Sequence, residues 1–196
     1  MSTIKPPKTS WRFTSSTWIK IGVAVAVLAA LLVYRESKFK TYGTHHELVG
    51  QPAPDFSIPL FGSEDEQLNL LDYRGQVVLI DFWATWCMPC KRQMPRLRHV
   101  GGYFADEDFQ IITVNVDDEA RTRRREIHQY LHHNHIKFPV GLDDHKVQMT
   151  YDAARIPTMI LVGRDGTIRR YFGGMTTATH IKKAVRAELK RELPLP

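Results

Sequence analysis

Residues 77–91 read VVLIDFWATWCMPCK, so a nearly unbroken apolar run leads directly into two cysteines separated by two residues. The run is rich in β-branched and aromatic residues, which is typical of a strand buried on both faces of a sheet. Pro89, between the cysteines, suits the first turn of a helix, where its missing N–H costs nothing. We therefore predict a buried strand over 77–83, a short turn, and a helix that begins near Cys87.

Cys87 and Cys90 are the only cysteines of the chain, and we predict that they form a redox-active pair. A disulfide across so small a loop removes little entropy from the unfolded chain, so it is a poor structural staple. A helix N-terminus lowers the pKa of a cysteine placed there, and Lys91 and Arg92 add positive potential. We expect Cys87 to be the exposed thiolate that attacks a partner disulfide, and Cys90 to be the deeper thiol that resolves the mixed disulfide.

Asp81 is the candidate proton acceptor for the thiol of Cys90. A carboxylate late in an otherwise apolar strand is expensive to bury, so its pKa should be raised. The alternative is a carboxylate at the end of the strand that is satisfied by backbone N–H groups. An inert cysteine pair is a further alternative, and zinc is disfavoured because a closed site needs two more ligands.

Residues 50–196 alternate predicted strands with predicted helices. The other expected strands cover 56–58, 67–70, 110–116, 158–162 and 167–172, and the other expected helices cover 119–133, 146–151 and 177–193. An Asp-Gly turn at 165–166 predicts a hairpin between the last two strands. The pattern indicates one α/β domain with a mixed sheet.

The first 40 residues differ in composition from the rest of the chain. They contain seven Lys or Arg residues and one acidic residue, whereas residues 47–196 balance 20 basic with 20 acidic residues, so the N-terminal segment holds the whole net charge of +6. This charge flanks the apolar segment 18–34, whose 17 residues would span about 25 Å as a helix. The charge therefore indicates membrane topology rather than nucleic-acid binding.

We accordingly predict four parts of the chain. They are a cytoplasmic tail at 1–17, a transmembrane anchor at 18–34, a tether at 35–49 and a folded domain at 50–196. A cleaved signal peptide is the alternative for the apolar segment, although the small residues that could form a cleavage site lie inside the apolar run.

Two segments carry a resemblance to a known family. Residues 81–91 resemble the active-site segment of thioredoxin, and residues 156–158 resemble its cis-proline loop. The segment 50–56, the turn at 72–75, the anchor and the long stretch between the dithiol and residue 157 are similar to the TlpA/ResA group of tethered extracytoplasmic thiol-disulfide oxidoreductases.

The resemblance implies a thioredoxin fold, in which helices flank a mixed central sheet, with an N-terminal β extension and a central αβ insertion. It also implies that Pro157 is cis and lies against the dithiol, that Ile156 offers backbone atoms to a substrate strand, and that Pro95 kinks the active-site helix. The substrate groove would then be formed by Trp86, Met88, Pro89, Ile156 and Pro157.

Two positions depart from the ResA pattern. Gln93 stands where several ResA-type proteins have Glu, and Asp81 stands where they often have Asn. The simplest inference is that the base sits at the thioredoxin position. These departures argue against a narrow assignment to cytochrome c maturation, and they leave apocytochromes, copper proteins and general disulfide proteins open as substrates.

We expect a reductase of disulfides in exported proteins, held by a single span in the bacterial cytoplasmic membrane with its folded domain in the periplasm. Asp81, Ile156 and the tether resemble the reductases of the group more than its oxidases. An oxidising compartment keeps a solitary dithiol oxidised unless it is recharged, so a membrane thiol electron donor is implied. A thiol oxidase or isomerase is the alternative. We expect no cofactor and no resident metal.

Three other sequence patterns bear on alternative functions. A histidine cluster could make a metal-handling module, for instance for copper, although such histidines are more often a solvated helix end; its members are His128, His132, His133 and His135. An arginine run could dock an acidic partner or be a solvated helix face, and it comprises Arg121, Arg123, Arg124 and Arg125. A peroxidase of the peroxiredoxin kind is disfavoured because Ala84 stands where that family needs Thr or Ser.

Overall fold

A computed structural model describes residues 20–31, 46–118 and 124–192 of the chain. The chain separates into two compact units, residues 1–41 and residues 42–196. In the first unit, residues 20–31 form an α-helix with exposed side chains. Among the described residues, no helix is both long enough and apolar enough to cross a bilayer. The predicted tail, most of the tether and residues 18–19 and 32–34 of the predicted anchor lie outside the described residues, so these segments stay predictions.

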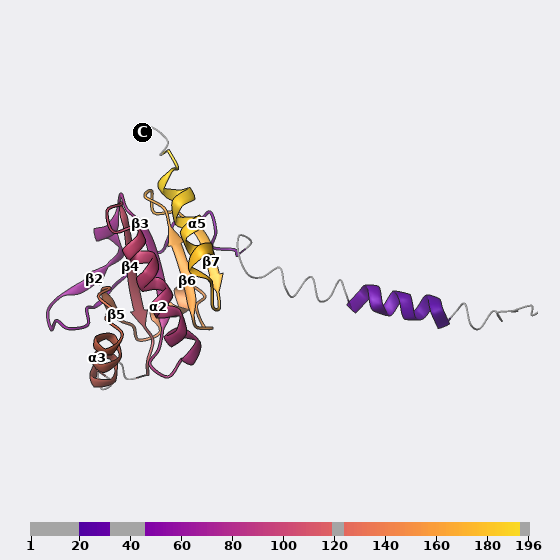
Figure 1. The fold of residues 1–196 in the computed structure, drawn as a ribbon, viewed down its shortest axis with the longest axis horizontal. Helices are drawn as coiled ribbons and strands as arrows, with labels where there is room; N and C mark the ends of the chain where they lie inside the picture. The colour runs from indigo at the N-terminus through magenta and orange to yellow at the C-terminus, as the bar shows by residue number, and fades with distance from the viewer. Residues whose placement is uncertain (1–19, 32–45, 119–123, 193–196) are drawn as a thin grey trace, which may run out of the picture. The chain divides into compact units, whose positions relative to one another are not determined.

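The second unit contains two sheets and the helices around them. The strands are β1 (Ser57–Pro59), β2 (Gln67–Asn69), β3 (Val77–Trp83), β4 (Phe109–Asn115), β5 (Val140–Leu142), β6 (Thr158–Val162) and β7 (Ile168–Gly173). The helices are the 3₁₀ helix η1 (Leu70–Tyr73) and the α-helices α2 (Met88–Tyr103), α3 (Arg124–His133), α4 (Lys146–Thr150) and α5 (Ala178–Leu189). The larger sheet has the strand order β5-β4-β3-β6-β7, and β1 pairs with β2 in the smaller one (Figure 1).

The central strand of the larger sheet, β3, leads directly to the dithiol. All of its residues are buried, as the continuous apolar run predicts. It pairs in parallel with β4 and antiparallel with β6, so the predicted mixed sheet is confirmed. Trp83 lies opposite Asn115 of β4, and Phe82 lies opposite Thr158 of β6. The last residues of β3 and β4 and the first residue of β6 therefore meet at one end of the sheet.

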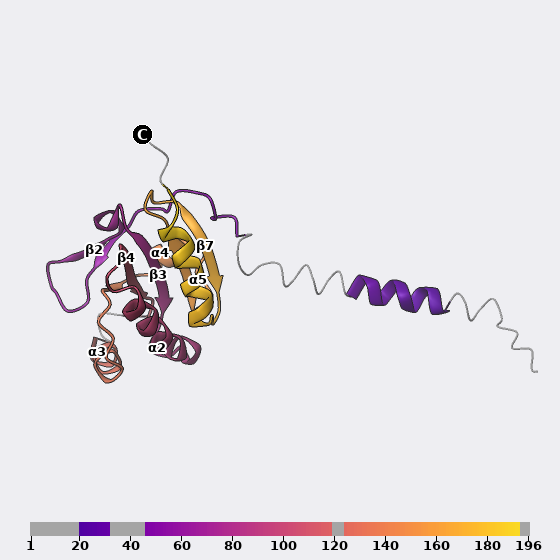
Figure 2. The same ribbon diagram turned by 45° about the horizontal axis from the view of Figure 1, so that its top comes forward.

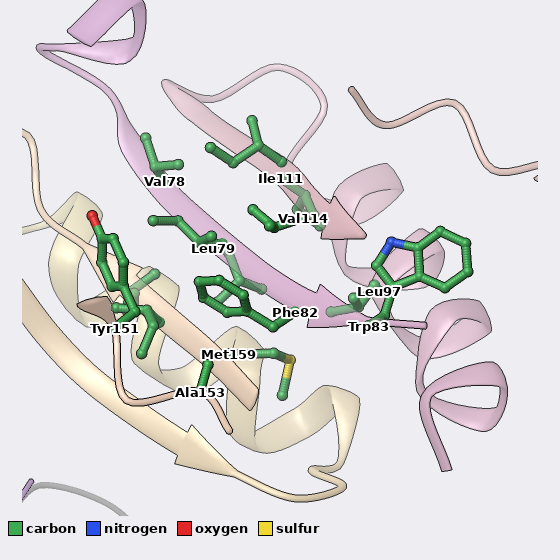
Figure 3. Close-up of a cluster of buried hydrophobic side chains, with 14 of the residues drawn as sticks. Val78, Leu79, Phe82, Trp83, Leu97, Ile111, Val114, Tyr151, Ala153 and Met159 are labelled. Atoms are coloured by element: carbon green, nitrogen blue, oxygen red, sulfur yellow. The ribbon is translucent and has the colours of Figure 1, made fainter. Parts of the chain in front are cut away.

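Helices α2 and α5 pack together on one face of the sheet (Figures 1 and 2). Successive residues of a strand point to opposite faces, so Phe82 and Trp83 enter different layers of the core. The ring of Tyr151, the residue after α4, lies 5.8 Å from the ring of Phe82 and 6.1 Å from that of Phe56. Figure 3 shows part of this core, with Phe82, Trp83 and Tyr151 drawn as sticks. The apolar run of β3 thus holds helices or connecting segments against both faces of the sheet.

The β1–β2 hairpin packs against the edge strand β5. Gly141 permits this close approach, because a Cβ atom there would lie 2.3 Å from Cδ1 of Ile58. Phe61 N–H donates to the carbonyl oxygen of Val140 at 2.7 Å, which continues the contact along the chain. A bare edge strand invites pairing with other chains, and the hairpin partly covers this one. The expected N-terminal β extension is therefore confirmed, and α3 with β5 forms the expected insertion between β4 and β6.

Two helices differ in their bounds from the predicted segments. The final helix ends at Leu189 and not at Leu193: Lys190 is its C-cap, and Lys190 N–H donates to the carbonyl oxygen of Arg186 at 3.3 Å. Its start agrees with the prediction: Thr177 is the N-cap, and its hydroxyl accepts a hydrogen bond from His180 N–H at 3.3 Å. The described part of the predicted helix 119–133 begins at Arg124, and residues 119–123 lie outside the described residues.

Candidate active site

Cys87 and Cys90 form a disulfide at the N-terminus of α2. Cys87 is the N-cap residue, and the backbone N–H of Cys90 donates to its Sγ at 3.1 Å. Pro89 lies in the first turn, as predicted. The pairing is confirmed, but the expected exposure of Cys87 is wrong: Cys87 is 4% exposed and Cys90 is 1% exposed. The sulfur of Cys87 faces the first turn of α2, where it bonds to Cys90 and accepts the hydrogen bond from Cys90 N–H.

Exposed apolar side chains lie next to the buried disulfide along the chain. Trp86 and Met88, on either side of Cys87, are 58% and 60% exposed. The Ile156–Pro157 bond is cis, as the resemblance implied, and Ile156 is half-buried. Because Phe82 lies opposite the residue that follows Pro157, this proline is at the same end of the sheet as the dithiol. The structure thus brings two distant segments of the predicted groove to one end of the domain.

Asp81 lies within β3 and is 1% exposed. Its Oδ1 atom has no hydrogen-bond partner among the described residues. The alternative in which backbone N–H groups satisfy the carboxylate therefore fails for this oxygen. Burial raises the pKa of Asp81 well above its ordinary value. A carboxylate in this environment favours its protonated form, which suits a group that accepts a proton during thiol exchange.

Tyr130 of α3 is a site residue that the sequence analysis missed. Its hydroxyl donates to the carbonyl oxygen of Lys91 at 3.1 Å. In a regular helix that carbonyl would accept from the N–H of residue 95, but Pro95 has none, so Tyr130 supplies the missing donor. Its ring centroid lies 5.4 Å from that of Trp83. Burial, and to a lesser extent the charge of Asp81, raises the pKa of Tyr130 to about 12. The inserted helix thus contacts the active-site helix within electrostatic reach of Asp81.

Gln93 is fully buried at the position where the ResA pattern has Glu. Its Oε1 accepts a hydrogen bond from Thr176 N–H at 3.0 Å, and its Nε2 faces Sδ of Met159 at 3.8 Å. Met159 is the cross-strand partner of Asp81. A neutral amide therefore joins α2 to the segment before α5 without burying a second charge near the strand pair that carries Asp81.

The histidines of α3 border the site. His128 and His132 have stacked rings with centroids 6.0 Å apart, and they line an open groove together with Trp86 and Lys91. Within residues 20–31, 46–118 and 124–192, no group of three or more His, Cys, Asp or Glu side chains could hold a metal ion. The metal-handling alternative therefore gains no support from the described residues. Two members of the predicted arginine run, at 121 and 123, lie outside them.

Residues 49–171, more than half of the chain, match the AhpC/TSA family. The chain belongs to this family. It is similar to thiol-disulfide oxidoreductase ResA of Geobacillus thermodenitrificans, with 30% identity over 136 residues that cover 69% of this chain and 75% of that protein. It is also similar to ResA of Bacillus subtilis, with 27% identity over 165 residues that cover 84% and 88%.

Among solved structures, this AhpC/TSA family member resembles a Chlorobium tepidum protein assigned as thiol:disulfide interchange protein DsbE. The TM-score is 0.64 at 27% identity, over 72% of this chain and 97% of that one. Together with the dithiol geometry, these relatives make the protein a ResA-like thiol-disulfide oxidoreductase with a thioredoxin-like fold. Its substrates are accordingly disulfide-containing proteins.

Proposed function

We propose that this oxidoreductase works as a reductase of disulfides in exported proteins. The observation that carries the proposal is the incompletely hydrogen-bonded, buried carboxylate of Asp81 in the strand that leads to the dithiol. A base with a raised pKa can take a proton from the buried thiol of Cys90, which must ionise before it can resolve a mixed disulfide. This is the step that completes reduction of a substrate.

The reaction transfers two electrons from the Cys87–Cys90 dithiol to the substrate disulfide. The thiolate of Cys87 attacks one sulfur of the substrate disulfide, forms a mixed disulfide and releases the first substrate thiolate. Asp81 accepts the proton of Cys90, and the Cys90 thiolate then attacks Sγ of Cys87 and releases the second substrate thiolate. The product is the Cys87–Cys90 disulfide that the structure contains. A membrane thiol donor then returns two electrons to it.

An extended substrate segment would bind across the end of the sheet that carries the disulfide. Trp86 and Met88 offer exposed apolar surface, and Ile156 before the cis proline lies at the same end of the sheet. In this proposal the backbone of Ile156 binds the substrate strand, while Pro157 and Pro89 shape the groove around the sulfurs.

We place the reaction on the periplasmic side of the bacterial cytoplasmic membrane. Counting Lys20 with the residues before the apolar run, four basic residues precede it and three follow it, which favours a tail in the cytoplasm and a domain outside it. A membrane-impermeant maleimide should label Cys87 in intact spheroplasts after mild reduction. Labelling only after lysis would contradict this location.

Trapping the mixed disulfide tests the order of the two cysteines. Reduced full-length Cys90→Ala, purified in detergent, should form a covalent adduct with insulin that dithiothreitol removes. Cys87→Ala should form none, because its remaining thiol is the resolving one. Equal trapping by the two variants would reverse the assignment.

A further inference from the structure

Asp117, two residues beyond β4, contacts the loop that carries the dithiol. The residue is 1% exposed, and both of its carboxylate oxygens face Thr85. The backbone N–H of Thr85 donates to Oδ1 and Oδ2 at 3.1 and 3.0 Å, and the Thr85 hydroxyl donates to Oδ1 at 2.9 Å. Thr85 lies two residues before Cys87, so this carboxylate holds the chain directly ahead of the disulfide.

The carboxylate of Asp117 is itself fixed by β4. Nδ2 of Asn115, the last residue of β4, donates to Oδ2 of Asp117 at 2.9 Å, and Asp117 N–H donates back to Oδ1 of Asn115 at 3.2 Å. Asn115 is fully buried and lies opposite Trp83 in the sheet. Val116 N–H donates to the carbonyl oxygen of Trp83 at 2.9 Å, which ties the same turn to the end of β3. The hydrogen bonds from Thr85 to the Asp117 carboxylate, which we call the clamp, are therefore anchored in the sheet.

The loop between β3 and α2 depends on this clamp. Within the described residues, one backbone hydrogen bond lies wholly inside this loop, from Cys87 N–H to the Ala84 carbonyl oxygen at 3.2 Å, and a second, from Lys91 N–H to the Cys87 carbonyl oxygen at 3.1 Å, joins the loop to α2. A buried N–H without a partner costs free energy, and hydrogen bonds to a charged acceptor are among the stronger ones in proteins. Without Asp117, the N–H and hydroxyl of Thr85 would lose their acceptor, and the loop would be free to shift.

We propose that Asp117 is a positioning residue for disulfide exchange, acting through Thr85 to fix Trp86 and Cys87 over the N-terminus of α2. Displacing a reacting group by about 1 Å can cost a hundredfold in rate. The proposal deepens the proposed function, because it concerns the same dithiol, but it rests only on thiol-disulfide exchange and not on the direction of electron flow.

The test compares two buried aspartates in the full-length chain. Asp117→Asn removes the charged acceptor of Thr85. Asp143→Asn is the matched control, because Asp143 is also buried and accepts backbone hydrogen bonds, from Val147 at 3.1 Å and Gln148 at 2.8 Å in α4. We measure kcat and KM for insulin reduction and the rate at which glutathione opens the Cys87–Cys90 disulfide, both at temperatures where each variant is fully folded.

Asp117→Asn should lower kcat and the glutathione rate by about 10- to 100-fold, while Asp143→Asn should stay within about twofold of the unaltered chain. Thr85→Val should lose most of the same rate, and Thr85→Ser, which keeps the hydroxyl, should recover most of it. Equal rates for the two aspartate variants would overturn the proposal and leave Asp117 a purely structural residue. Failure of the unaltered chain to reduce insulin would overturn the proposed function alone, because the glutathione rate still tests the clamp.

Discussion

Two buried aspartates, one within β3 and one two residues beyond its neighbour β4, differ in how their charge is compensated. Asp81 in β3 and Asp117 beyond β4 are equally buried, at 1% exposure. An oxygen of Asp81 lacks a hydrogen-bond partner among the described residues, and burial raises the pKa of that carboxyl. Asp117 instead accepts hydrogen bonds from Thr85 and Asn115. Burial alone therefore does not decide what a carboxylate does; the donors around it do.

This contrast assigns different roles to the two carboxylates at the active site. A carboxylate whose charged form is poorly compensated takes up a proton readily, which suits chemistry. A carboxylate surrounded by donors stays in place and orders the groups that bind it, which suits positioning. Asp81 lies within β3, and Asp117 follows the end of β4, the strand that pairs in parallel with β3. Substitutions of Asp81 and Asp117 should therefore have different effects on rate and on stability.

The largest expected effect is kinetic and follows removal of the base. In Asp81→Asn, resolution of a mixed disulfide by Cys90 should slow by about 100-fold at pH 7, because general base catalysis is lost. Acid quenching followed by non-reducing electrophoresis measures the decay of the mixed disulfide. An unchanged decay rate would mean that another group accepts the proton of Cys90.

The next effect is on stability, and its sign should differ between the two aspartates. Asp81 has a raised pKa in the folded state, so the folded state binds more protons and its stability falls as pH rises from the ordinary carboxyl pKa through the folded one. Asp81→Asn removes this loss and should be more stable than the unaltered chain above the folded pKa. Asp117→Asn should be less stable by about 1–3 kcal/mol, because it disturbs satisfied buried hydrogen bonds.

Urea denaturation of the oxidised chain at acidic, neutral and alkaline pH measures both responses. Destabilisation by Asp81→Asn at alkaline pH would contradict the account of its environment. A neutral effect of Asp117→Asn would mean that its hydrogen bonds contribute nothing net to folding.

A smaller effect is expected from the inserted helix. Tyr130→Phe should cost about 1 kcal/mol, because the Lys91 carbonyl that Pro95 leaves open loses its donor. Tyr103→Phe is the matched control: the Tyr103 hydroxyl accepts a hydrogen bond from Arg186 at the surface, where loss of one bond should cost less than about 0.5 kcal/mol. Urea midpoints of the two variants give the comparison, and equal losses would remove the special role assigned to Tyr130.

The smallest effect concerns His145, whose imidazole pairs with Asp118, the residue after Asp117. Its Nδ1 faces Oε1 of Gln148 at 2.8 Å and its Nε2 faces Oδ1 of Asp118 at 2.9 Å. Hydrogen bonds to Gln148, and then to Asp118, raise the pKa of His145. This stabilisation is therefore complete below the unfolded pKa and is lost as pH rises through the folded pKa.

His145→Asn should thus lower stability by about 0.5 kcal/mol or less near pH 6, since the pair is exposed, and should have no effect at alkaline pH. Asn tolerates the left-handed backbone found at this position, where φ is 70°. Thermal unfolding at the two pH values measures the difference. A loss that persists unchanged at alkaline pH would show that protonation of His145 is not its source.

Local sequence patterns predicted the elements that carry the dithiol. The apolar run gave β3 with the correct ends, and Pro89 placed the start of α2 correctly. The cis bond at Pro157 followed from resemblance, because no local pattern distinguishes it. These features depend on residues close together in the chain, where periodicity and proline chemistry determine backbone conformation.

The missed features join residues that are far apart in the chain. Thr85 and Asp117 are 32 residues apart, and Lys91 and Tyr130 are 39 apart. Pro95 implies that one carbonyl oxygen of the helix needs a donor from elsewhere, but only the fold shows which residue provides it. The burial of Cys87 in the disulfide was also missed. Tertiary contacts, rather than local patterns, decide the pairing of Thr85 with Asp117 and of Lys91 with Tyr130.

The reduction potential of the Cys87–Cys90 pair tests the central claim most directly. The full-length chain in detergent is equilibrated with glutathione and dithiothreitol buffers, and the fraction of free thiols is measured after acid quenching and alkylation. The account predicts a potential near or below about −220 mV, among the reducing dithiols. A value near about −120 mV would identify an oxidant and contradict the proposed direction of electron flow.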